Sequence, residues 1–255
     1  MIKLHFPSLF IVQNWIISPL NMSKTIFIGD VHGCIEELES LWSQLSISKG
    51  DRVIQVGDLI NKGPSSREVI QFCIKNKIES ILGNHEIRML SIFKDKASLK
   101  SGTIKDYEQD TLRELKTKDW EYLQSLDYTI SLKKEKIVVV HAGFLPAVPL
   151  EEQSNKVMTK IQVIDAFGKP HKRAKCPDGV EWSQLWRGPP FVIYGHTPKI
   201  KIDRKKWSLG LDTSCVYGHK LSAYILESDE WVQVNAKKCY SWNRYISPYS
   251  QCNES

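Results

Sequence analysis

Short runs of apolar, β-branched residues recur along the chain, and each run ends in a polar turn. Five segments share this pattern: TIFIGDVHG, RVIQVGDLINKG, ESILGNHE, KIVVVHAG and PFVIYGHTP. Apolar runs of this length predict buried strands. Because the turns are rich in Gly, Asp, His and Asn, we expect polar side chains to gather where the strands end.

Segments with helical periodicity lie between the first three of these predicted strands. A stripe of apolar residues with helical spacing lies between the first two, at Ile35, Leu38, Leu41, Trp42 and Leu45. A second helix is predicted to begin near Pro64–Ser66. This alternation predicts an α/β fold with a βαβαβ core, a largely parallel sheet and flanking helices. Since such sheets bind ligands at the carboxyl ends of their strands, the five turns should meet at one edge.

Residues 94–130 interrupt the alternation of strands and helices. They are charged and have a helical pattern, with expected inward positions at Leu112, Leu115, Trp120, Tyr122 and Leu123. We expect a small helical cap or insertion beside the site. From about residue 207, further strands are predicted in WSLGLDTS, KLSAYILES and EWVQVNA. The predicted organisation is one domain over residues 22–255 that includes this cap.

Residues 1–21 are harder to interpret. Residues 4–23 have only one ionisable side chain, His5, and many apolar ones, but Pro7, Gln13, Asn14 and Pro19 interrupt the run. That composition is poor for a signal peptide and weak for a membrane span. Met22 begins MSKTIFIGD, which looks like a natural start. We therefore expect an extension that the core does not need, with an extra packed segment and a targeting or membrane signal as alternatives.

Composition adds a few limits. The chain has 255 residues, of which 25% are charged and 42% hydrophobic, as is ordinary for a soluble globular protein. The net charge of +6 suits an anionic substrate or nucleic acid, although ordinary basic proteins share it. Six cysteines without a CxxC pair predict reduced thiols and a cytoplasmic protein. We expect no stable association with a membrane and infer no obligate protein partner.

The polar turns carry side chains that bind metals, namely Asp30, His32, Asp58, Asn84, His85, His141 and His196. One Asp or His alone would have an ordinary structural explanation, but five turns with such side chains at strand ends do not. Carboxylates, imidazoles and an amide oxygen are typical ligands of hard divalent cations that activate water. A bridging carboxylate allows two such ions to hold a water, lower its pKa and screen phosphate charge.

These motifs, GDVHG, GDLINKG, GNHE, HAG and GH in this order, resemble the phosphoprotein-phosphatase branch of the calcineurin-like metallophosphoesterases. The resemblance covers roughly Thr25 to Leu226 and implies a mixed-sheet sandwich with two divalent metal ions. Manganese is expected first, with iron, zinc or cobalt as alternatives. The resemblance implies that His85 protonates the leaving group. It also implies a ligand set: Asp30 and His32 on one ion, Asp58 as the bridge, and Asn84, His141 and His196 on the other.

Asn61 and Lys62 stand where protein Ser/Thr phosphatases have Asp and Arg in a GDxVDRG motif. The neutral residue and the lysine resemble the ApaH-like phosphatases, relatives of symmetrical dinucleoside tetraphosphatase. The stretches HAGFLPAVPLEEQ, WRGPPFVIYGHTPK and GLDTSCVYGHKLSA resemble that subgroup too. The two positions therefore bear on the substrate that the enzyme cleaves.

A physical argument accompanies this resemblance. An acidic partner raises the pKa of His85, which helps most when a poor leaving group such as a serine alkoxide must be protonated. A phosphate leaving group, with a second pKa of about 6, needs less help, so Asn61 fits phosphoanhydride cleavage. Alternatively, His85 has a different acidic partner. Lys62 keeps a positive charge without the fork of Arg and should contact one phosphate oxygen.

Further candidates come from their place near the motifs. Arg187 in LWRGPP aligns with a second phosphate-binding Arg of related phosphatases, and its alternative is a surface position. Arg88 follows GNHE and faces either the site or solvent. Trp182 and Trp186 either stack on a purine or, more simply, pack in the core. The segment Lys199–Lys206 either meets distal phosphates or is a solvated basic loop.

The leading hypothesis is a dinuclear hydrolase that cleaves a phosphoanhydride in a dinucleoside polyphosphate or capped nucleotide by attack of a metal-bound hydroxide. Lys62 and Arg187 would stabilise the phosphoryl oxygens, and Arg88 and Asn84 would help to bind substrate. A nucleotide polyphosphate is the expected partner, with capped RNA as an extension. The rival enzyme is a protein Ser/Thr or Tyr phosphatase. The rival of another class is an inactive phosphatase fold that binds nucleotides or RNA.

Overall fold

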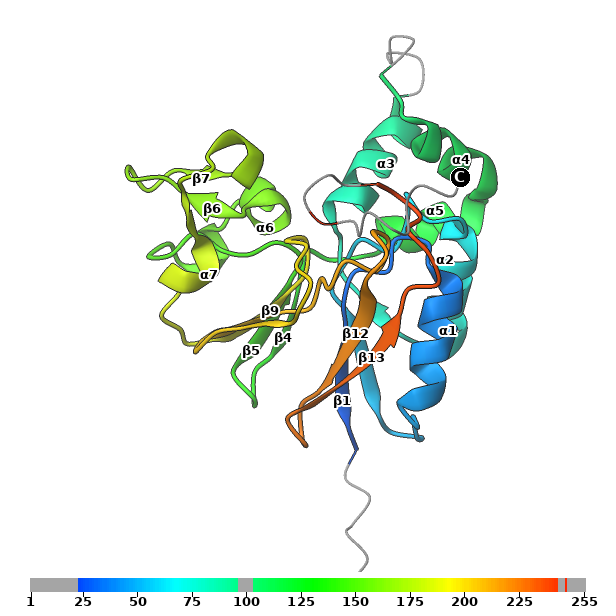
Figure 1. Ribbon diagram of the computed structural model, residues 1–255, viewed down its shortest axis with the longest axis horizontal. Coiled ribbons are helices and arrows are strands. Elements are labelled where there is room, and N and C mark those ends of the chain that lie inside the picture. The colour runs from blue at the N-terminus through cyan, green and yellow to red at the C-terminus, as the bar shows by residue number, and fades with distance from the viewer. Residues whose placement is uncertain (1–22, 96–102, 243–245, 247–255) are drawn as a thin grey trace, which may run out of the picture.

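The computed structural model describes residues 23–95, 103–242 and 246. The extension expected over residues 1–21 lies outside these described residues. Two five-stranded sheets pack face to face, and helices cover their outer faces (Figure 1). The first sheet has the order β13-β12-β1-β2-β3, with strands β1 (Thr25–Ile28), β2 (Arg52–Gln55), β3 (Glu79–Ser80), β12 (Lys220–Ile225) and β13 (Glu230–Asn235).

The first sheet contains the predicted βαβαβ unit. Strands β1, β2 and β3 pair in parallel, joined by helices α1 (Ile35–Gln44) and α2 (Ser66–Asn76). Strand β12 returns antiparallel beside β1, so the sheet is mixed. Helix α2 ends at Lys77, whose left-handed backbone closes the last turn. The α/β class and the βαβαβ core predicted from the sequence are confirmed.

The second sheet has the order β10-β11-β9-β5-β4. Its centre is parallel, since β5 pairs with β9 and β9 with β11, while β4 and β10 are antiparallel edges. The strands are β4 (Thr129–Leu132), β5 (Ile137–Val140), β9 (Phe191–Tyr194), β10 (Asp203–Arg204) and β11 (Ser208–Gly210).

Alternation along the strands builds three apolar layers. In β1, Phe27 faces the second sheet while Ile26 and Ile28 face the helices. In β5, Val139 lies between the sheets and Val140 lies on the outer face. Successive side chains of a strand point to opposite faces, so one short run contributes to two layers. Each fully buried Ile or Phe stabilises the fold by about 1.5–3 kcal/mol relative to exposure.

Helices cover the first sheet and the second differently. Helix α1 packs on β12 and β13, and α3 (Asn84–Lys94), α4 (Asp106–Glu114) and α5 (Thr117–Gln124) pack on one another or on α2. Trp120 and Leu123 of α5 join the core under these helices. On the second sheet, Trp182, Trp186 and Phe144 fill the outer layer. The tryptophans are thus core residues, which excludes them as an exposed stacking face for a purine.

A third, three-stranded sheet was not predicted. It has the order β7-β6-β8, from Pro170–His171, Val163–Ile164 and Val180–Glu181. Around it lie α6 (Asn155–Lys160), α7 (Trp182–Leu185) and two 3₁₀ turns, Leu150–Glu152 and Arg173–Lys175. These strands have two residues each, which is too short for alternation to be visible in the sequence.

Two other features concern the whole chain. Within the described ranges, no helix is both long and apolar enough to cross a membrane. Cys34, Cys73, Cys176 and Cys215 are free thiols, whereas Cys239 is disulfide-bonded. The expectation of reduced thiols throughout is therefore wrong for Cys239. Pairing depends on how closely two cysteines approach in the fold, and a sparse spacing in the sequence does not exclude it.

Candidate active site

The polar turns meet in one cavity of about 280 Å³ at the carboxyl edge of the strands. Turns after β1, β2, β3 and β9 bring five of the six predicted metal ligands to its wall: Asp30, His32, Asp58, Asn84 and His196. His85 and Lys62 line the cavity as well. His141 follows β5 and is fully buried beneath it. The structure therefore brings together the whole predicted ligand set.

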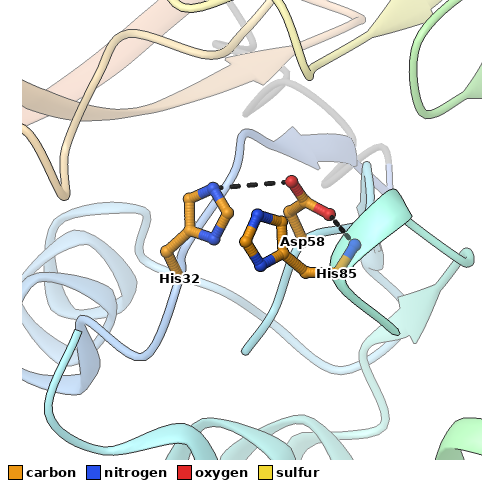
Figure 2. Close-up of side chains that lie close together, drawn as sticks. All are labelled: His32, Asp58 and His85. Atoms are coloured by element: carbon orange, nitrogen blue, oxygen red, sulfur yellow. Dashed lines mark hydrogen bonds and ion pairs between the residues drawn. The ribbon is translucent and has the colours of Figure 1, made fainter. Parts of the chain in front are cut away.

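Asp58 lies at the centre of the group. Its Oδ2 is 3.4 Å from His32 Nε2, and its Oδ1 is 3.4 Å from His141 Nε2. The backbone N–H of His85 donates to Oδ1 over 3.0 Å, as Figure 2 shows. Two groups of side chains each bring their ligand atoms within 4.8 Å of one another, and Asp58 belongs to both. The first group is His32, Asp58 and His85, and the second is Asp58, His141 and His196. A carboxylate with one oxygen toward each set has the geometry of a bridge.

Backbone carbonyls fix the orientation of the two histidines beside Asp58. His32 Nδ1 lies 3.1 Å from the oxygen of Ile60, and His141 Nδ1 lies 2.9 Å from that of Val56. With Nδ1 donating to a carbonyl, each ring points its Nε2 at Asp58. This arrangement is typical of metal-binding histidines, whose other nitrogen is held by a backbone group.

The two rings differ in their electrostatic surroundings. Burial and the ammonium of Lys62, 2.9 Å from Nε2, lower the pKa of His32 to about 3. Burial also disfavours charge on His141, but the Asp58 carboxylate outweighs it and raises the pKa of His141 to about 10. Asp58 remains ionised because His141 and His85 offset the effect of its burial on its pKa.

Asp30 and His196 form the other side of the cavity. The N–H of His196 donates to Asp30 Oδ2 over 3.0 Å, and the Nε2 of His196 is a buried atom without a hydrogen-bond partner. Burial and the nearby Asp212 raise the pKa of Asp30 well above its ordinary value. Crowded buried carboxylates and an unpartnered imidazole nitrogen are what a divalent cation would satisfy. The residues present therefore fit a metal centre.

Two glycines leave room for these carboxylates. A Cβ at Gly195 would lie 1.9 Å from Asp30 Oδ1, and a Cβ at Gly83 would lie 2.2 Å from Asp58 Oδ1. Neither position can hold a larger residue without moving a ligand. The glycine of each motif thus serves the close approach of two turns in these places.

The turns themselves are strained. His32, Asp58, Asn61, Lys62 and His196 all have positive φ, between 49° and 72°. Non-glycine residues adopt this left-handed region at an energetic cost, and such residues cluster at functional sites. The positive φ at consecutive positions of the second motif turns Asn61 and Lys62 toward different neighbours.

Asn61 lies against His85, as the motif comparison requires. Its amide nitrogen is 3.0 Å from His85 Nδ1, and its Oδ1 is buried without a partner. Burial lowers the pKa of His85 well below its ordinary value, and Asp58 only partly offsets this. An amide that donates to Nδ1 leaves the proton of a neutral imidazole on Nε2. This contact leaves Nε2 as the nitrogen of His85 that is available to a departing oxygen.

Lys62, the residue after Asn61 in the same turn, also lines the cavity. Its ammonium lies over the Tyr217 ring, 5.0 Å from the centroid, as well as beside His32. Burial lowers the pKa of Lys62, but Tyr217, Asp58 and Asp212 outweigh it, so the net shift is upward. Lys62 is thus a permanent cation at the cavity wall.

Sequence reasoning missed Glu86, although it is part of the quoted GNHE motif. Glu86 is fully buried and accepts four backbone N–H groups. Oε2 takes those of Asp58 and Gly83 at 2.9 and 2.8 Å, and Oε1 takes those of Leu59 and Ile60 at 2.9 and 3.3 Å. One carboxylate therefore joins the second turn to the third and fixes the backbone of Asp58.

Asp212 was missed as well. It follows β11 and lines the cavity beside Asp30, and burial raises its pKa to about 6. Its sequence context, GLDTS, repeats the pattern of an apolar run followed by Asp at a strand end. That signal was available, but the segment was assigned only as a strand and as part of the ApaH-like resemblance, without a role for Asp212.

The two arginine candidates lie elsewhere. Arg88 is outside the metal cavity and contacts Glu108 at 3.3 Å and the carbonyl oxygen of Thr103 at 2.9 Å. Arg187 donates to the carbonyl of Gln184 and lines a separate hollow with Lys206. Because the preceding residue, Trp186, is buried in the core on the outer face of the second sheet, Arg187 is held on that side of the molecule. The structure does not bring Arg187 to the predicted ligands.

Comparisons with known proteins agree with this geometry. The sequence model of the family described as calcineurin-like phosphoesterase matches residues 23–233. The asymmetrical bis(5'-nucleosyl)-tetraphosphatase PrpE of Oceanobacillus iheyensis is 27% identical over 241 residues, which cover 84% of this chain and 93% of that protein. The symmetrical bis(5'-nucleosyl)-tetraphosphatase of Neisseria gonorrhoeae is 25% identical over 280 residues, covering 86% and 98%.

A solved structure is similar over most of its length. The crystal structure of a protein assigned as a diadenosine tetraphosphatase superimposes with a TM-score of 0.75 at 29% identity, covering 84% of this chain and 94% of that one. Together with the family match over residues 23–233, this confirms the resemblance that the five motifs indicated. The chain belongs to the calcineurin-like phosphoesterase family.

Proposed function

We propose that the protein hydrolyses a phosphoanhydride bond of dinucleoside polyphosphates such as diadenosine tetraphosphate (Ap4A). The observation that carries the proposal is the contact of Asn61 with His85 inside the cavity of metal-binding residues. A neutral partner leaves the proton donor weakly basic, which suits a leaving phosphate better than a leaving alkoxide. The names of the relatives support the same substrate class.

Divalent cations fit the cavity, with manganese proposed first. Asp30, His32, Asn84, His141 and His196 would hold them, and Asp58 would bridge. Bound ions of this kind lower the pKa of a coordinated water and neutralise charge on phosphate oxygens. The chain supplies the rest: Glu86 keeps the Asp58 turn in place, and the strained turns hold the ligands at fixed positions.

Lys62 and His85 have different tasks in the proposed reaction. The ammonium of Lys62 binds a nonbridging oxygen of the attacked phosphate as a point charge. His85 donates its Nε2 proton to the oxygen that departs, while Asn61 keeps the ring oriented through Nδ1. Negative charge develops on the departing phosphate oxygen, and this proton and the nearby cations neutralise it. Arg187 is not part of the proposed set, because it lies in a separate hollow.

The rival assignments lack such support. A protein phosphatase would need an acidic partner on His85, and in the described part of the chain no carboxylate hydrogen-bonds to its ring. An inactive fold would be expected to lack a ligand, whereas all six candidates are gathered here. Capped RNA has no support among the relatives and is left out of the proposal.

A substrate panel tests the proposed function. Purified enzyme with added manganese is compared on Ap4A, ATP, inorganic polyphosphate, a phosphoserine peptide and a phosphotyrosine peptide, with kcat/KM as the readout. The expected result is highest activity on Ap4A, and an Asp58→Asn variant prepared in parallel controls for contaminating phosphatases. Higher kcat/KM on either phosphopeptide than on Ap4A would contradict the proposal.

A further inference from the structure

The metal cavity is continuous with a second hollow beyond His85. This hollow measures about 390 Å³ and shares five residues with the metal cavity: Asn84, His85, Lys105, Tyr107 and Lys172. It adds Arg88, which follows His85 by three residues on α3, so it extends along that helix and away from Asp58. Because His85 is the proposed proton donor, the second hollow lies where a leaving group would emerge.

The second hollow is positively charged. Lys105 precedes α4, Lys160 ends α6 and Lys172 follows β7, and all three line it. Arg88 has an acidic partner there in Glu108, but among residues 23–95, 103–242 and 246 none of the three lysines has one. All three line the same hollow, and burial, followed by the charges of Lys160 and Lys105, lowers the pKa of Lys172.

Like charges held together destabilise a fold unless an anion joins them. Resting on the proposed function, we propose that this lysine cluster, Lys105, Lys160 and Lys172, binds the departing polyphosphate chain and selects substrates whose leaving group is an anion with two or more phosphates. In the step itself, a water molecule gives up one proton to solvent and its oxygen bonds to the attacked phosphorus. The bond from phosphorus to the bridging oxygen breaks, and its electron pair stays on that oxygen, which takes the proton of His85.

The lysine cluster also disfavours the rival substrates. A phosphopeptide would leave as an uncharged alcohol and would place a peptide chain against three exposed ammonium groups that it cannot neutralise. A leaving polyphosphate meets each ammonium with an oxygen anion, and contacts of this kind become stronger as charge develops on the departing oxygen. The lysine cluster thus selects among leaving groups, whereas Lys62 and the proposed metal ligands bind the attacked phosphate of any substrate.

Single lysine variants test the inference on two substrates. Lys105→Ala, Lys160→Ala and Lys172→Ala should each lower kcat/KM for Ap4A about fivefold, as expected for a partly exposed charge pair. For p-nitrophenyl phosphate, whose leaving group carries no phosphate, Lys160→Ala, which lines the second hollow and not the metal cavity, should stay within about twofold. Lys105→Ala and Lys172→Ala should lose less activity on p-nitrophenyl phosphate than on Ap4A. Lys134→Ala, in the exposed turn between β4 and β5, removes one charge elsewhere and should affect neither substrate. Equal losses on both substrates, or no loss on Ap4A, would overturn the inference.

Two further measurements separate this inference from the proposed function. Isothermal titration with inorganic tripolyphosphate should show binding to the wild type and to Lys134→Ala, and weaker binding to the three lysine variants. This result does not need Ap4A hydrolysis, so a wild type that fails to cleave Ap4A refutes the proposed function while the titration still decides on the lysine cluster. Unchanged binding in all three variants would refute the cluster.

Hydrolysis of Ap4A in ¹⁸O-labelled water identifies the fragment that leaves. The attacked fragment carries the label, and the leaving fragment does not. The lysine cluster requires the unlabelled fragment to keep at least two phosphates, so either ADP or ATP departs. Unlabelled AMP together with ATP labelled on its terminal phosphate would contradict the inference.

Discussion

The two edges of the first sheet are built in opposite ways. At the amino edge, Asp51 accepts the N–H groups of Lys24 and Ser48 at 2.7 and 2.8 Å, and Arg52 pairs with Glu79 at 2.6 Å. The polar groups of these pairs satisfy one another. At the carboxyl edge, Asn61 Oδ1 is buried without a partner. So is the Nε2 of His196, which reaches the same cavity from β9 of the second sheet.

Strain is distributed in the same way. At the amino edge, positive φ occurs at Ser46 and Lys77, which follow helices, at Gly50, and at Asp229 in the turn between β12 and β13. Left-handed residues are ordinary after helices and in such turns. At the carboxyl edge, positive φ affects the proposed ligands His32, Asp58 and His196 themselves. The comparison teaches that the polar groups of one edge stabilise the fold, whereas the other edge keeps unsatisfied polar groups at the proposed metal site. Changes at the two edges should therefore have opposite effects on activity and stability.

The largest effect is expected from Asp58→Asn at the carboxyl edge. An amide nitrogen cannot bridge two cations, so both should be lost, and kcat should fall about a thousandfold or more. Added manganese should raise the Tm of the wild type by mass action but leave that of the variant unchanged. Metal analysis by mass spectrometry provides the direct readout. Two ions still bound to Asp58→Asn would show that Asp58 is not the bridge.

Glu86→Gln should affect both stability and activity, because Glu86 connects the fold to the site. The new NH₂ group would face backbone N–H donors and leave at least one buried and unpaired, at a cost of about 2 kcal/mol. Metal affinity should fall as the Asp58 turn loosens. Glu79→Gln is the matched control, since that carboxylate is 43% exposed. Urea denaturation and manganese titration measure the two effects, and a Glu86→Gln variant as stable as Glu79→Gln would refute this role.

Asn61→Asp should alter selectivity while keeping the metal site. A carboxylate beside Nδ1 raises the pKa of His85, which burial holds low. A shift of one unit makes the protonated acid about tenfold more abundant near neutral pH. The benefit should fall on poor leaving groups, so the ratio of kcat/KM for a phosphoserine peptide to that for Ap4A should rise about tenfold. The ratio is measured for each variant between pH 6 and 9.

Lys62→Arg is the control for this change. It strengthens the grip on the attacked phosphate of both substrates and should leave their ratio unchanged. If Asn61→Asp also leaves the ratio unchanged, the missing carboxylate does not set the substrate class. The anhydride assignment would then rest on the relatives and on the lysine cluster alone.

The carboxyl edge was largely predictable because the backbone fixes it. Each ligand follows its strand by a few residues, so recognising the strand places the side chain. Asp212 has the same pattern after β11 and could have been found. Glu86 could not be recognised as a structural anchor, because a buried carboxylate is not expected unless its four N–H partners are known.

The surroundings of the site were less predictable for a different reason. Lys105, Lys160 and Lys172 reach the hollow with long side chains from three segments that have no common pattern in the sequence. Arg187 was assigned from its place after Trp186, but the burial of that tryptophan holds the arginine in another hollow. Spacing in a sequence describes strand ends well and describes the reach of flexible side chains from distant loops poorly.

The smallest effect is expected at the amino edge, from Asp51→Asn. Burial would raise the pKa of Asp51, but the N–H groups of Lys24 and Ser48 outweigh it and hold the pKa below its ordinary value. A carboxyl group whose pKa is lowered by folding stabilises the protein above its unfolded pKa of about 3.9, and this contribution is lost as the pH falls through the folded value. Asn replaces one acceptor oxygen by a donor, much as protonation does. Asp51→Asn should therefore cost about 1 kcal/mol at pH 7, and the difference should shrink below pH 4, with kcat/KM unchanged.

Asp110→Asn, in an exposed pair with Arg113, controls for the loss of a surface charge and should cost less than about 0.5 kcal/mol. Denaturation curves at pH 7 and pH 3.5 provide the measurement, and a difference of the same size at both would mean that Asp51 acts through packing and not through its charge.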